Sequence, residues 1–276
     1  MDIKEVVKEF KKFKPKAIAL WGSYGMGLND KFTHDIDIAI YVNKLPTQSS
    51  KKPIFSKLSD SNLKLPWEGD FFIKNYEIYE IKFIQCNDIE QKIKDLKKGK
   101  NDFENNIAVF IRDTKIIYDT NWLIKLKNKI KKYPNKLFKN NFNENLTLAF
   151  RKIHHYDRAL NKRAKPLWAQ YIINRGTNYL IRTIFAANKT YYGKDKWLEY
   201  EINKFKIKPK NFEKNLIKLL KSRDISYYKK LVYEVYNTYK KHYPKEVARI
   251  LEVEKSLQKI DAQIELSKES NRFLIY

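Results

Sequence analysis

The chain has 276 residues, 43% of them hydrophobic, which is enough to bury a sizeable core and is more typical of two modest domains than of one. A single cysteine, Cys86, excludes an internal disulfide and a cysteine-based zinc cluster, and the four histidines lack a metal-binding spacing. No apolar run is long enough to cross a membrane and no signal-like segment opens the chain, so we expect a soluble, cytoplasmic protein without a membrane partner.

The formal net charge of +25 is unevenly distributed. Residues 1–135 hold 26 Lys and Arg against 18 Asp and Glu, a net charge of +8, whereas residues 136–276 hold 31 against 14, a net charge of +17. An AT-rich genome alone enriches a protein in lysine, so the charge by itself identifies no partner. The concentration of charge in the second half favours a polyanion there, such as a nucleoside triphosphate, an RNA or an acidic surface.

The first half begins with patterns typical of a helix and of strands. Residues 2–13 carry apolar side chains at helical spacing and predict a short amphipathic helix that ends before Pro15. Two β-rich runs, 17–21 and 36–42, predict strands on either side of a glycine-rich turn. Residues 45–67 contain three prolines and five serines and predict a loop with at most a helical turn.

The rest of the first half alternates between strand and helix patterns. Residues 71–84 predict a hairpin or a pair of strands, with Asn75 in the turn. Helices are predicted over 88–98 and 101–112, followed by a short strand over 115–119. These elements together predict a mixed β-sheet flanked by helices.

From about Asn121 onward the pattern is helical nearly throughout. The predicted helices lie near 121–132, 143–163, 167–188, 211–220, 226–241 and 245–267. The expected fold class is therefore α+β, with a mixed-sheet domain over 1–135 and an all-helical bundle domain over 136–276. The boundary is expected near 133–143.

Glycines are concentrated at one point of the sequence. Only seven occur in the chain, yet Gly22, Gly25 and Gly27 lie within six residues, directly after the run 17–21. Glycine permits a tight turn and lets backbone N–H groups approach an anionic phosphate, and the Ser23 hydroxyl can donate one further hydrogen bond. The segment therefore predicts a phosphate-binding turn.

The strand after this turn carries two aspartates. Asp35 and Asp37 are two residues apart, so both carboxylates project from the same face of the strand, with their Cα atoms about 6.5–7 Å apart. Such a pair of like charges is costly unless a cation compensates it, and Mg²⁺ bound to carboxylates and substrate phosphates is the usual solution. Two such ions clamp the attacking and leaving oxygens of an in-line displacement at phosphorus. The alternative is a glycine turn followed by two exposed strand aspartates.

Taken together, these residues resemble the signature of the DNA polymerase β-like nucleotidyltransferase superfamily. That signature is a hydrophobic residue, Gly-Ser, a spacer and Asp-x-Asp; here eleven residues separate Ser23 from Asp35. The resemblance covers about residues 17–42. It implies that Gly22 and Ser23 hold the β- and γ-phosphates of a nucleoside triphosphate and that Asp35 and Asp37 ligate the metal ions.

The same superfamily supplies a third carboxylate from a neighbouring strand, which completes the metal site and helps to activate the acceptor hydroxyl. We expect Glu80 in this role, because it is the acidic residue in a mostly apolar predicted strand. Glu77 is the alternative if a bulge or a register difference exchanges the two, and a solvent-facing edge carboxylate is the other interpretation. Lys82 shares a face with Glu80, where it either meets a phosphate of the nucleotide or neutralises the carboxylates.

A cationic stripe is predicted in the second half. Residues 167–192 predict a helix on which Arg175, Arg182 and Lys189 are seven residues apart. On an otherwise apolar helix such a stripe favours an anion, and Arg175 and Arg182 are our candidate nucleotide-binding residues there. A solvated face of a lysine-rich protein is the alternative.

The segment IFAANKTYYGKDKWLEYEI begins at Ile184 and carries a second resemblance, which covers roughly residues 180–200. It is similar to a Phe-Ala-Leu-Asn…Tyr…Lys-Trp-Leu segment in helical carboxyl-terminal domains attached to some nucleotidyltransferases, DUF4037 among them. Ala187 stands where that segment has leucine. The resemblance supports the two-domain organisation more than any particular substrate.

These features predict a Mg²⁺-dependent nucleotidyltransferase, with two ions expected, that transfers a nucleoside monophosphate from an NTP to an acceptor hydroxyl; ATP is the expected donor. The basic domain 136–276 is expected to bind the acceptor. Antibiotic-modifying members of the superfamily favour a small molecule, whereas the charge and the toxin or antitoxin members favour RNA, including tRNA, or a protein hydroxyl. The second hypothesis is a non-catalytic nucleotide- or RNA-binding module, against which the intact Asp-x-Asp pair argues.

Overall fold

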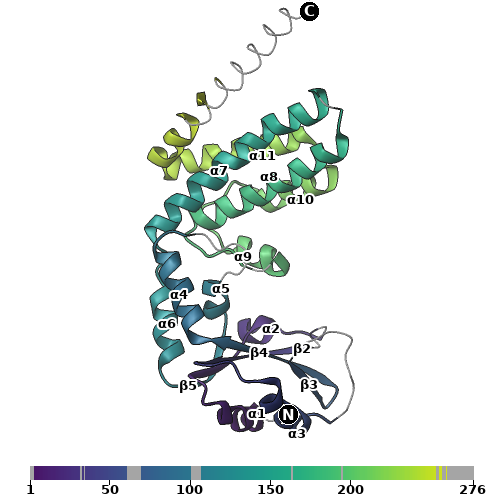
Figure 1. The fold of residues 1–276 in the computed structure, drawn as a ribbon. Coiled ribbons are helices and arrows are strands. Elements are labelled where there is room, and N and C mark those ends of the chain that lie inside the picture. The colour runs from purple at the N-terminus through teal and green to yellow at the C-terminus, as the bar shows by residue number, and fades with distance from the viewer. Residues whose placement is uncertain are drawn as a thin grey trace, which may run out of the picture. The chain divides into compact units, whose positions relative to one another are not determined.

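The chain divides into two compact units, Met1–Tyr133 and Pro134–Tyr276, drawn in Figure 1. The structure is a computed structural model, and it describes residues 3–31, 33, 35–60, 70–100, 107–162, 164–193, 195–252, 255–256 and 259. Among the helices within these ranges, none combines the length and the apolar character that crossing a membrane requires.

A five-stranded mixed sheet lies at the centre of the first unit, with the strand order β3-β4-β2-β1-β5. The strands are β1 (Ala17–Leu20), β2 (Asp35–Val42), β3 (Phe71–Lys74), β4 (Glu77–Gln85) and β5 (Lys115–Asp119). Strands β2 and β4 run parallel, and the other neighbouring strands run antiparallel. The middle strand is β2, and it is buried along almost its whole length. The parallel β2–β4 pair therefore lies at the centre of the sheet.

The predicted hairpin is confirmed as β3 and β4. Asn75 and Tyr76 form its turn with φ angles of +50° and +64°, the left-handed conformation that a type I′ hairpin turn requires at both positions. The backbone N–H of Asn75 donates a hydrogen bond of 2.8 Å to the carboxylate of Asp60. This contact ties the turn to the chain that follows α3 (Gln48–Leu58).

One face of the sheet is covered by α1 (Ile3–Phe10) and α3, which lie beside each other in Figure 1. Fully buried Ile38 and Ile40 of β2 pack there against Phe10 and Leu58 in the main core of this unit. The apolar positions of β2 point to this face, so the alternate positions of the strand, which include both aspartates, point to the other one.

Further helices complete the first unit. They are the 3₁₀ turn Lys11–Phe13, α2 (Gly22–Met26), α4 (Cys86–Lys97), α5 (Ile107–Arg112) and α6 (Trp122–Ile130). Part of the second face of the sheet is covered by α5 and α6, because the ring of Tyr41 packs against Phe110 and Trp122. The first part of the predicted helix 101–112, residues 101–106, lies outside the described residues.

The loop predicted over 45–67 is wrong, because α3 occupies Gln48–Leu58. Its start is capped by Thr47, whose hydroxyl accepts a 3.3 Å hydrogen bond from the backbone N–H of Ser50. The remainder of that segment, 61–69, lies outside the described residues.

Burial explains why a helix forms in spite of its proline. Ile54 and Leu58 are buried one helical turn apart against the sheet, and Lys51 forms a 2.6 Å ion pair with Asp70. An internal proline such as Pro53 costs about 3 kcal/mol in a helix, and the cap and the two buried side chains offset it.

The second unit is helical throughout its described part, which confirms the α+β class. Its elements are α7 (Asn135–Asp157), a π-helical turn at Arg158–Lys162, α8 (Pro166–Ala187), a 3₁₀ turn at Asp195–Trp197, α9 (Leu198–Asn203), α10 (Phe212–Ser222) and α11 (Ile225–His242). Residues 244–252 are also helical, and most of the predicted helix beyond them lies outside the described residues.

The first helix of this unit begins earlier than predicted. Instead of starting near residue 143, α7 begins at Asn135, directly after Pro134. Leu137, Phe138 and Phe142 are buried on one side of its first turns. The polar residues between them hide this apolar stripe in the sequence, so the expected connecting segment is part of the helix.

Close backbone packing joins α7, α8 and α11. A Cβ atom on Gly176 of α8 would lie 2.3 Å from the hydroxyl oxygen of Tyr228, so only glycine fits there. That hydroxyl is buried and donates a 2.7 Å hydrogen bond to the carbonyl oxygen of Ala149 on α7. The contact fixes α8 against α7, which matters for the side chains that these two helices carry.

Candidate active site

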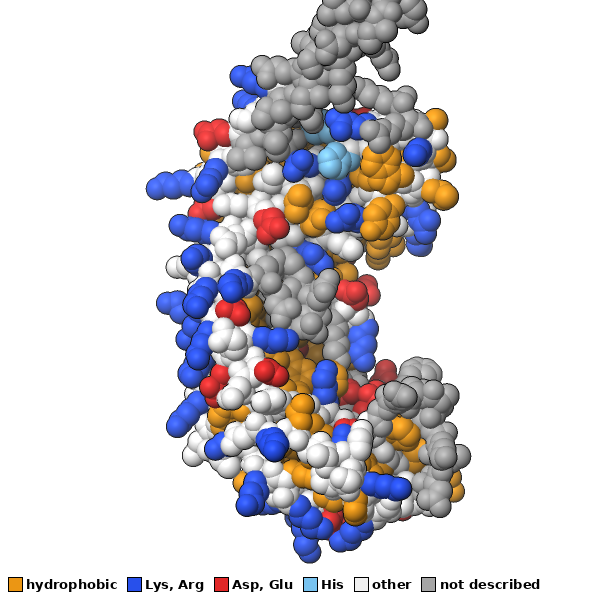
Figure 2. All heavy atoms as spheres, viewed as in Figure 1, with side chains coloured by type: hydrophobic (Ala, Val, Ile, Leu, Met, Phe, Trp, Pro, Cys, Tyr) orange, Lys and Arg blue, Asp and Glu red, His pale blue; other side chains and the backbone are white. Residues whose placement is uncertain are grey.

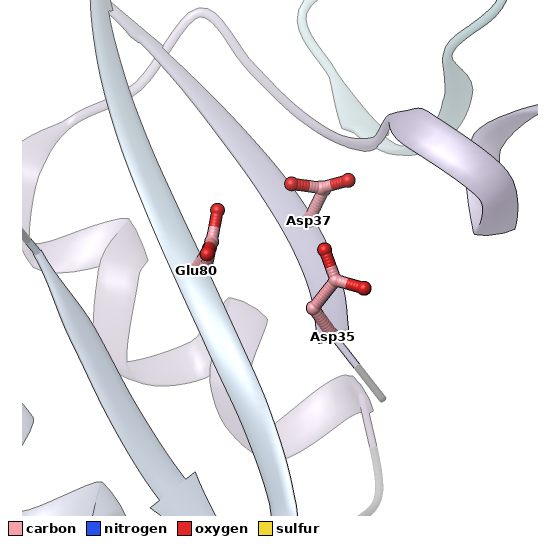
Figure 3. A group of neighbouring side chains, drawn as sticks. All are labelled: Asp35, Asp37 and Glu80. Atoms are coloured by element: carbon pink, nitrogen blue, oxygen red, sulfur yellow. The ribbon is translucent and has the colours of Figure 1, made fainter. Parts of the chain in front are cut away.

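Three carboxylates meet on the second face of the sheet. Asp37 of β2 is the register partner of Glu80 of β4, and Asp35 precedes Asp37 on the same face. One oxygen atom from each of the three side chains lies within 4.8 Å of the others, and Figure 3 shows them converging from the two strands. The parallel register of β2 and β4 therefore builds this carboxylate cluster (Asp35, Asp37 and Glu80).

The three carboxylates differ in their exposure. Asp37 is 5% exposed and is enclosed by the surrounding chain, whereas Asp35 and Glu80 reach the solvent. A ligand that approaches the cluster thus meets Asp35 and Glu80 from the open side and Asp37 at its base.

The glycine-serine turn lies directly against Asp37. The backbone N–H of Trp21 donates a 3.0 Å hydrogen bond to the carbonyl oxygen of Asp37, which places the end of β1 beside the cluster. Gly22 follows with a φ angle of +64°, and a Cβ atom on it would lie 1.9 Å from a carboxylate oxygen of Asp37. Both the backbone conformation and the space at this position require glycine.

Gly22 and Ser23 form the first turn of α2. The first N–H groups of a helix have no acceptor within it, so these two residues present backbone donors next to the carboxylates. The side chain of Ser23 is buried. Gly25 has a separate reason to be glycine, because a Cβ atom there would lie 2.6 Å from the carbonyl oxygen of Asp113.

Glu77 is directed away from the carboxylate cluster. It lies three residues before Glu80, so the alternation of β4 turns it to the opposite face. There its carboxylate accepts a 2.8 Å hydrogen bond from the hydroxyl of Tyr79. Burial and this hydrogen bond raise the pKa of Tyr79. Of the two candidate glutamates, Glu80 is the one that the structure places with Asp35 and Asp37.

Lys82 lies two residues after Glu80 on β4, so it is on the same face of the strand. Its amine lies 5.5 Å from the ring centroid of Trp21 and 5.9 Å from that of Phe110. The two rings contact each other, with centroids 4.7 Å apart. No local pattern predicts Phe110 at this position, since the contact depends on how α5 packs on the sheet.

The donor set fits a hard divalent cation. Three carboxylates within 4.8 Å supply only oxygen ligands, which Mg²⁺ prefers. Like charges at this distance repel one another unless a cation lies between them, and cation binding removes that cost. The cluster can therefore hold a metal ion.

The two arginines expected to bind the nucleotide both lie on α8 of the second unit. Arg175 is exposed, and its guanidinium lies 5.7 Å from the ring of Tyr171. Arg182 is half-buried and lies 5.6 Å from the ring of Tyr192. Lys189 follows the end of α8, near the ring of Phe138. The expected stripe is thus divided among three different surroundings.

The fold and this arrangement define a nucleotidyltransferase domain: a mixed sheet whose central strands carry three carboxylates beside a glycine-serine turn. A family model for the nucleotidyltransferase domain matches residues 2–149, and one for the domain of unknown function DUF4037 matches residues 103–198. The first match spans more than half of the chain. The chain belongs to the nucleotidyltransferase domain family.

Other comparisons are more distant. A nucleotidyltransferase-like protein from Exiguobacterium sibiricum, known from a crystal structure, is similar at 10% sequence identity and a TM-score of 0.44. The alignment covers 86% of this chain and 76% of that one. No curated protein matches the sequence.

Proposed function

We propose that this protein is a Mg²⁺-dependent nucleotidyltransferase that moves a nucleoside monophosphate from an NTP, with ATP as the expected donor, to an acceptor hydroxyl. The observation that carries the proposal is the convergence of Asp35, Asp37 and Glu80 beside Gly22. A protein that only binds a polyanion gains nothing from three carboxylates facing it, so the cluster favours a catalyst over a non-catalytic binding module.

Each residue of the site has a proposed role. Asp35 and Asp37, with Glu80 as the third ligand, hold two Mg²⁺ ions, which when bound supply positive charge to the phosphate oxygens as negative charge develops. The N–H groups of Gly22 and Ser23 donate hydrogen bonds to the β- and γ-phosphates. The amine of Lys82 supplies a further positive charge to the triphosphate.

The transfer is an in-line displacement at the α-phosphorus. The acceptor oxygen forms a bond to this phosphorus, the bond to the bridging oxygen breaks, and pyrophosphate leaves with the bonding electrons. The proton of the acceptor hydroxyl passes to the carboxylate of Glu80, which faces the solvent side of the cluster.

The acceptor is proposed to bind to the basic domain, residues 136–276, which contains Arg175 and Arg182. Its net charge of +17 suits an anionic acceptor. A small molecule, an RNA and a protein hydroxyl each remain candidates for the labelled acceptor.

The direct test incubates the full chain with each of the four α-³²P-labelled NTPs and a cell extract separated into small-molecule, RNA and protein fractions. We expect label in one fraction, dependent on Mg²⁺ and accompanied by pyrophosphate, and no label with Asp37→Asn. Label that persists with Asp37→Asn would contradict the site assignment. ATP binding that needs no Mg²⁺, without pyrophosphate release from any fraction, would favour the non-catalytic module.

A further inference from the structure

A second group of like charges lies on the helical unit. Arg151 and Lys152 belong to α7, and Arg175 belongs to α8. Lys152 is only 8% exposed, although lysine is rarely buried without a partner of opposite charge. Within the described part of the chain, no carboxylate lies within ion-pair distance of its amine.

The groups around Lys152 are neutral or positive. Its amine lies 3.5 Å from Nδ1 of His155 and 5.7 Å from the ring centroid of Tyr179. Burial lowers the pKa of Lys152, and the positive charges of Arg175 and Arg151 lower it further. The charges of Arg151 and Arg175 therefore act on Lys152 as repulsion, which a bound anion would relieve.

The sequence around this point is poor in acidic residues. Between residues 158 and 194 there are eight Lys and Arg and no Asp or Glu, so α8 carries no acidic side chain along its whole length. The nearest acidic residue of α7 in sequence, Asp157, lies 3.6 Å from the amine of Lys229. The positive charge near Arg175 is thus not neutralised by α8 itself.

Aromatic rings alternate with these cations. Arg175 donates a 3.2 Å hydrogen bond to the hydroxyl of Tyr179 and places its guanidinium 5.7 Å from the ring of Tyr171. Lys152, Tyr179, Arg175 and Tyr171 thus form a continuous line of contacts, which we call the cation–tyrosine row. It crosses from α7 to the outer face of α8.

The outer end of the row is unusually apolar for a surface. Tyr171 is 57% exposed, and Leu167 and Trp168, one helical turn earlier, are 86% and 36% exposed. Figure 2 shows hydrophobic side chains beside Lys, Arg and His side chains on this part of the molecule. A binding partner must therefore offer both negative charge and flat apolar surfaces.

Single-stranded nucleic acid has both properties. Proteins bind it through cations that contact the phosphates and through aromatic rings on which the bases stack. An acidic protein surface or an inorganic anion would satisfy Lys152 and Arg175 and would leave Trp168 and Tyr171 without a function. A lone nucleotide has too few phosphates and bases to span a row of two cations and two rings.

We propose that the cation–tyrosine row is a binding surface for single-stranded nucleic acid. Its phosphates lie against Arg151, Lys152 and Arg175, and a base stacks on the exposed ring of Tyr171. The surface is independent of the carboxylate cluster, so nucleic acid binds whether or not the first unit transfers nucleotides.

The test measures the fluorescence anisotropy of a labelled single-stranded RNA of about 16 nucleotides, titrated with the full chain at several salt concentrations. Single-stranded DNA of the same sequence is measured in parallel, and binding of either the RNA or the DNA supports the proposal. The difference between the two affinities gives the contribution of the ribose hydroxyl. We expect Arg175→Gln to weaken binding and to reduce the slope of log K against log salt by about one. Tyr171→Ala should weaken binding about fivefold or more.

The matched control is Arg249→Gln, which removes the same group from an exposed arginine outside the row and should leave the affinity nearly unchanged. Equal losses for Arg175→Gln and Arg249→Gln would overturn the proposal, because binding would then follow net charge alone. An unchanged affinity for Tyr171→Ala, or equal competition by inorganic tripolyphosphate at the same phosphate concentration, would also overturn it.

One further variant separates this proposal from the proposed function. Asp37→Asn should bind the RNA as tightly as the unaltered chain even though it transfers no nucleotide. If the unaltered chain transfers nucleotides and does not bind either strand, the row fails as a nucleic-acid surface and the active site stands.

Discussion

The two units of this protein each bring three like charges together, and they do so on different scaffolds. In the first unit, the carboxylates of Asp35, Asp37 and Glu80 are fixed by the register of two parallel strands. In the second, Arg151, Lys152 and Arg175 reach their positions on long side chains from two helices. Strand pairing holds short side chains to a narrow geometry, which suits in-line chemistry, whereas long flexible cations can follow a polymer of variable shape.

A third charged group shows how the chain treats a buried charge that has no ligand to bind. Glu9 of α1 is buried and receives hydrogen bonds from Lys12 at 2.5 Å and from Lys57 of α3 at 2.6 Å. Here opposite charges compensate one another within the fold. Against this example, a group of three like charges indicates a ligand of opposite charge.

The largest expected effect distinguishes the two glutamates of β4. Glu80→Gln should lower kcat for nucleotidyl transfer by about 10²–10⁴-fold, because it removes a carboxylate from the cluster and the proposed proton acceptor. Glu77→Gln should leave kcat unchanged and lower the free energy of unfolding by about 1 kcal/mol, since it weakens the hydrogen bond from Tyr79. Steady-state kinetics and urea unfolding measure the two quantities.

A reversed result, with kcat lost in Glu77→Gln and kept in Glu80→Gln, would remove Glu80 from the site. It would also mean that the working register of β4 differs from the one described above.

The next effect tests why glycine precedes the serine of the turn. Gly22 and Gly27 both have positive φ angles, but a Cβ atom at Gly27 has nothing within 4 Å, whereas one at Gly22 meets the carboxylate of Asp37. Gly22→Ala should therefore destabilise the protein by about 1–3 kcal/mol more than Gly27→Ala, and of the two only Gly22→Ala should disturb metal binding. Thermal unfolding with and without Mg²⁺ measures both effects. Equal stability and equal metal binding in the two variants would mean that the backbone of the turn can shift to accommodate the Cβ atom without moving Asp37.

A smaller effect compares the two clusters directly. In the absence of Mg²⁺, Asp37→Asn should raise the free energy of unfolding by up to about 1 kcal/mol, because it removes a like charge from the group. The unaltered protein should gain stability when Mg²⁺ is added, and Asp37→Asn should lose most of this gain. At low salt, Arg175→Gln should stabilise the free protein by less, because Arg175 is exposed to solvent. A loss of stability in both variants would show that neither cluster is strained by repulsion.

Sequence patterns were sufficient to place much of the first unit. Period-two alternation places Asp35 and Asp37 on one face, and an acidic side chain among apolar neighbours indicates Glu80 without knowledge of the register of β4. These signals are local, because each depends on residues a few positions apart. The cap at Thr47 is also a local signal, but Pro53 makes the segment after it resemble a loop, and so the helix α3 is not predicted.

Long-range packing explains what the sequence left open. Phe110 reaches Lys82 only because α5 lies on the sheet, and Lys152 meets Tyr179 only because α7 and α8 lie side by side. The stripe from Arg175 to Lys189 shows the opposite error. Its regular spacing predicts one surface, yet Arg182 packs against Tyr192, which reaches it from outside α8. The spacing of residues along a helix sets the direction in which their side chains point, whereas the packing of neighbouring elements decides whether those side chains are exposed to solvent.

The smallest expected effect concerns Glu9, the charge that the fold itself compensates. The hydrogen bonds from Lys12 and then Lys57 lower the pKa of Glu9 from 4.5 to about 2. Between these two pH values the unfolded chain binds a proton that the folded chain does not, so the stability contributed by Glu9 is complete above pH 4.5 and is lost as the pH falls towards 2.

Glu9→Gln should therefore flatten the dependence of the unfolding free energy on pH between 4.5 and 2, with the largest difference from the unaltered protein at neutral pH. Urea unfolding at several pH values measures this dependence. The control is Glu5→Gln, which alters an exposed glutamate of the same helix whose ion pair with Lys74 spans 3.1 Å; an exposed pair of this kind contributes at most about 1 kcal/mol. If Glu9→Gln and the unaltered protein lose stability in parallel below pH 4.5, the two lysines do not hold Glu9 ionised. Glu9 would then no longer be an example of a buried charge that the fold compensates.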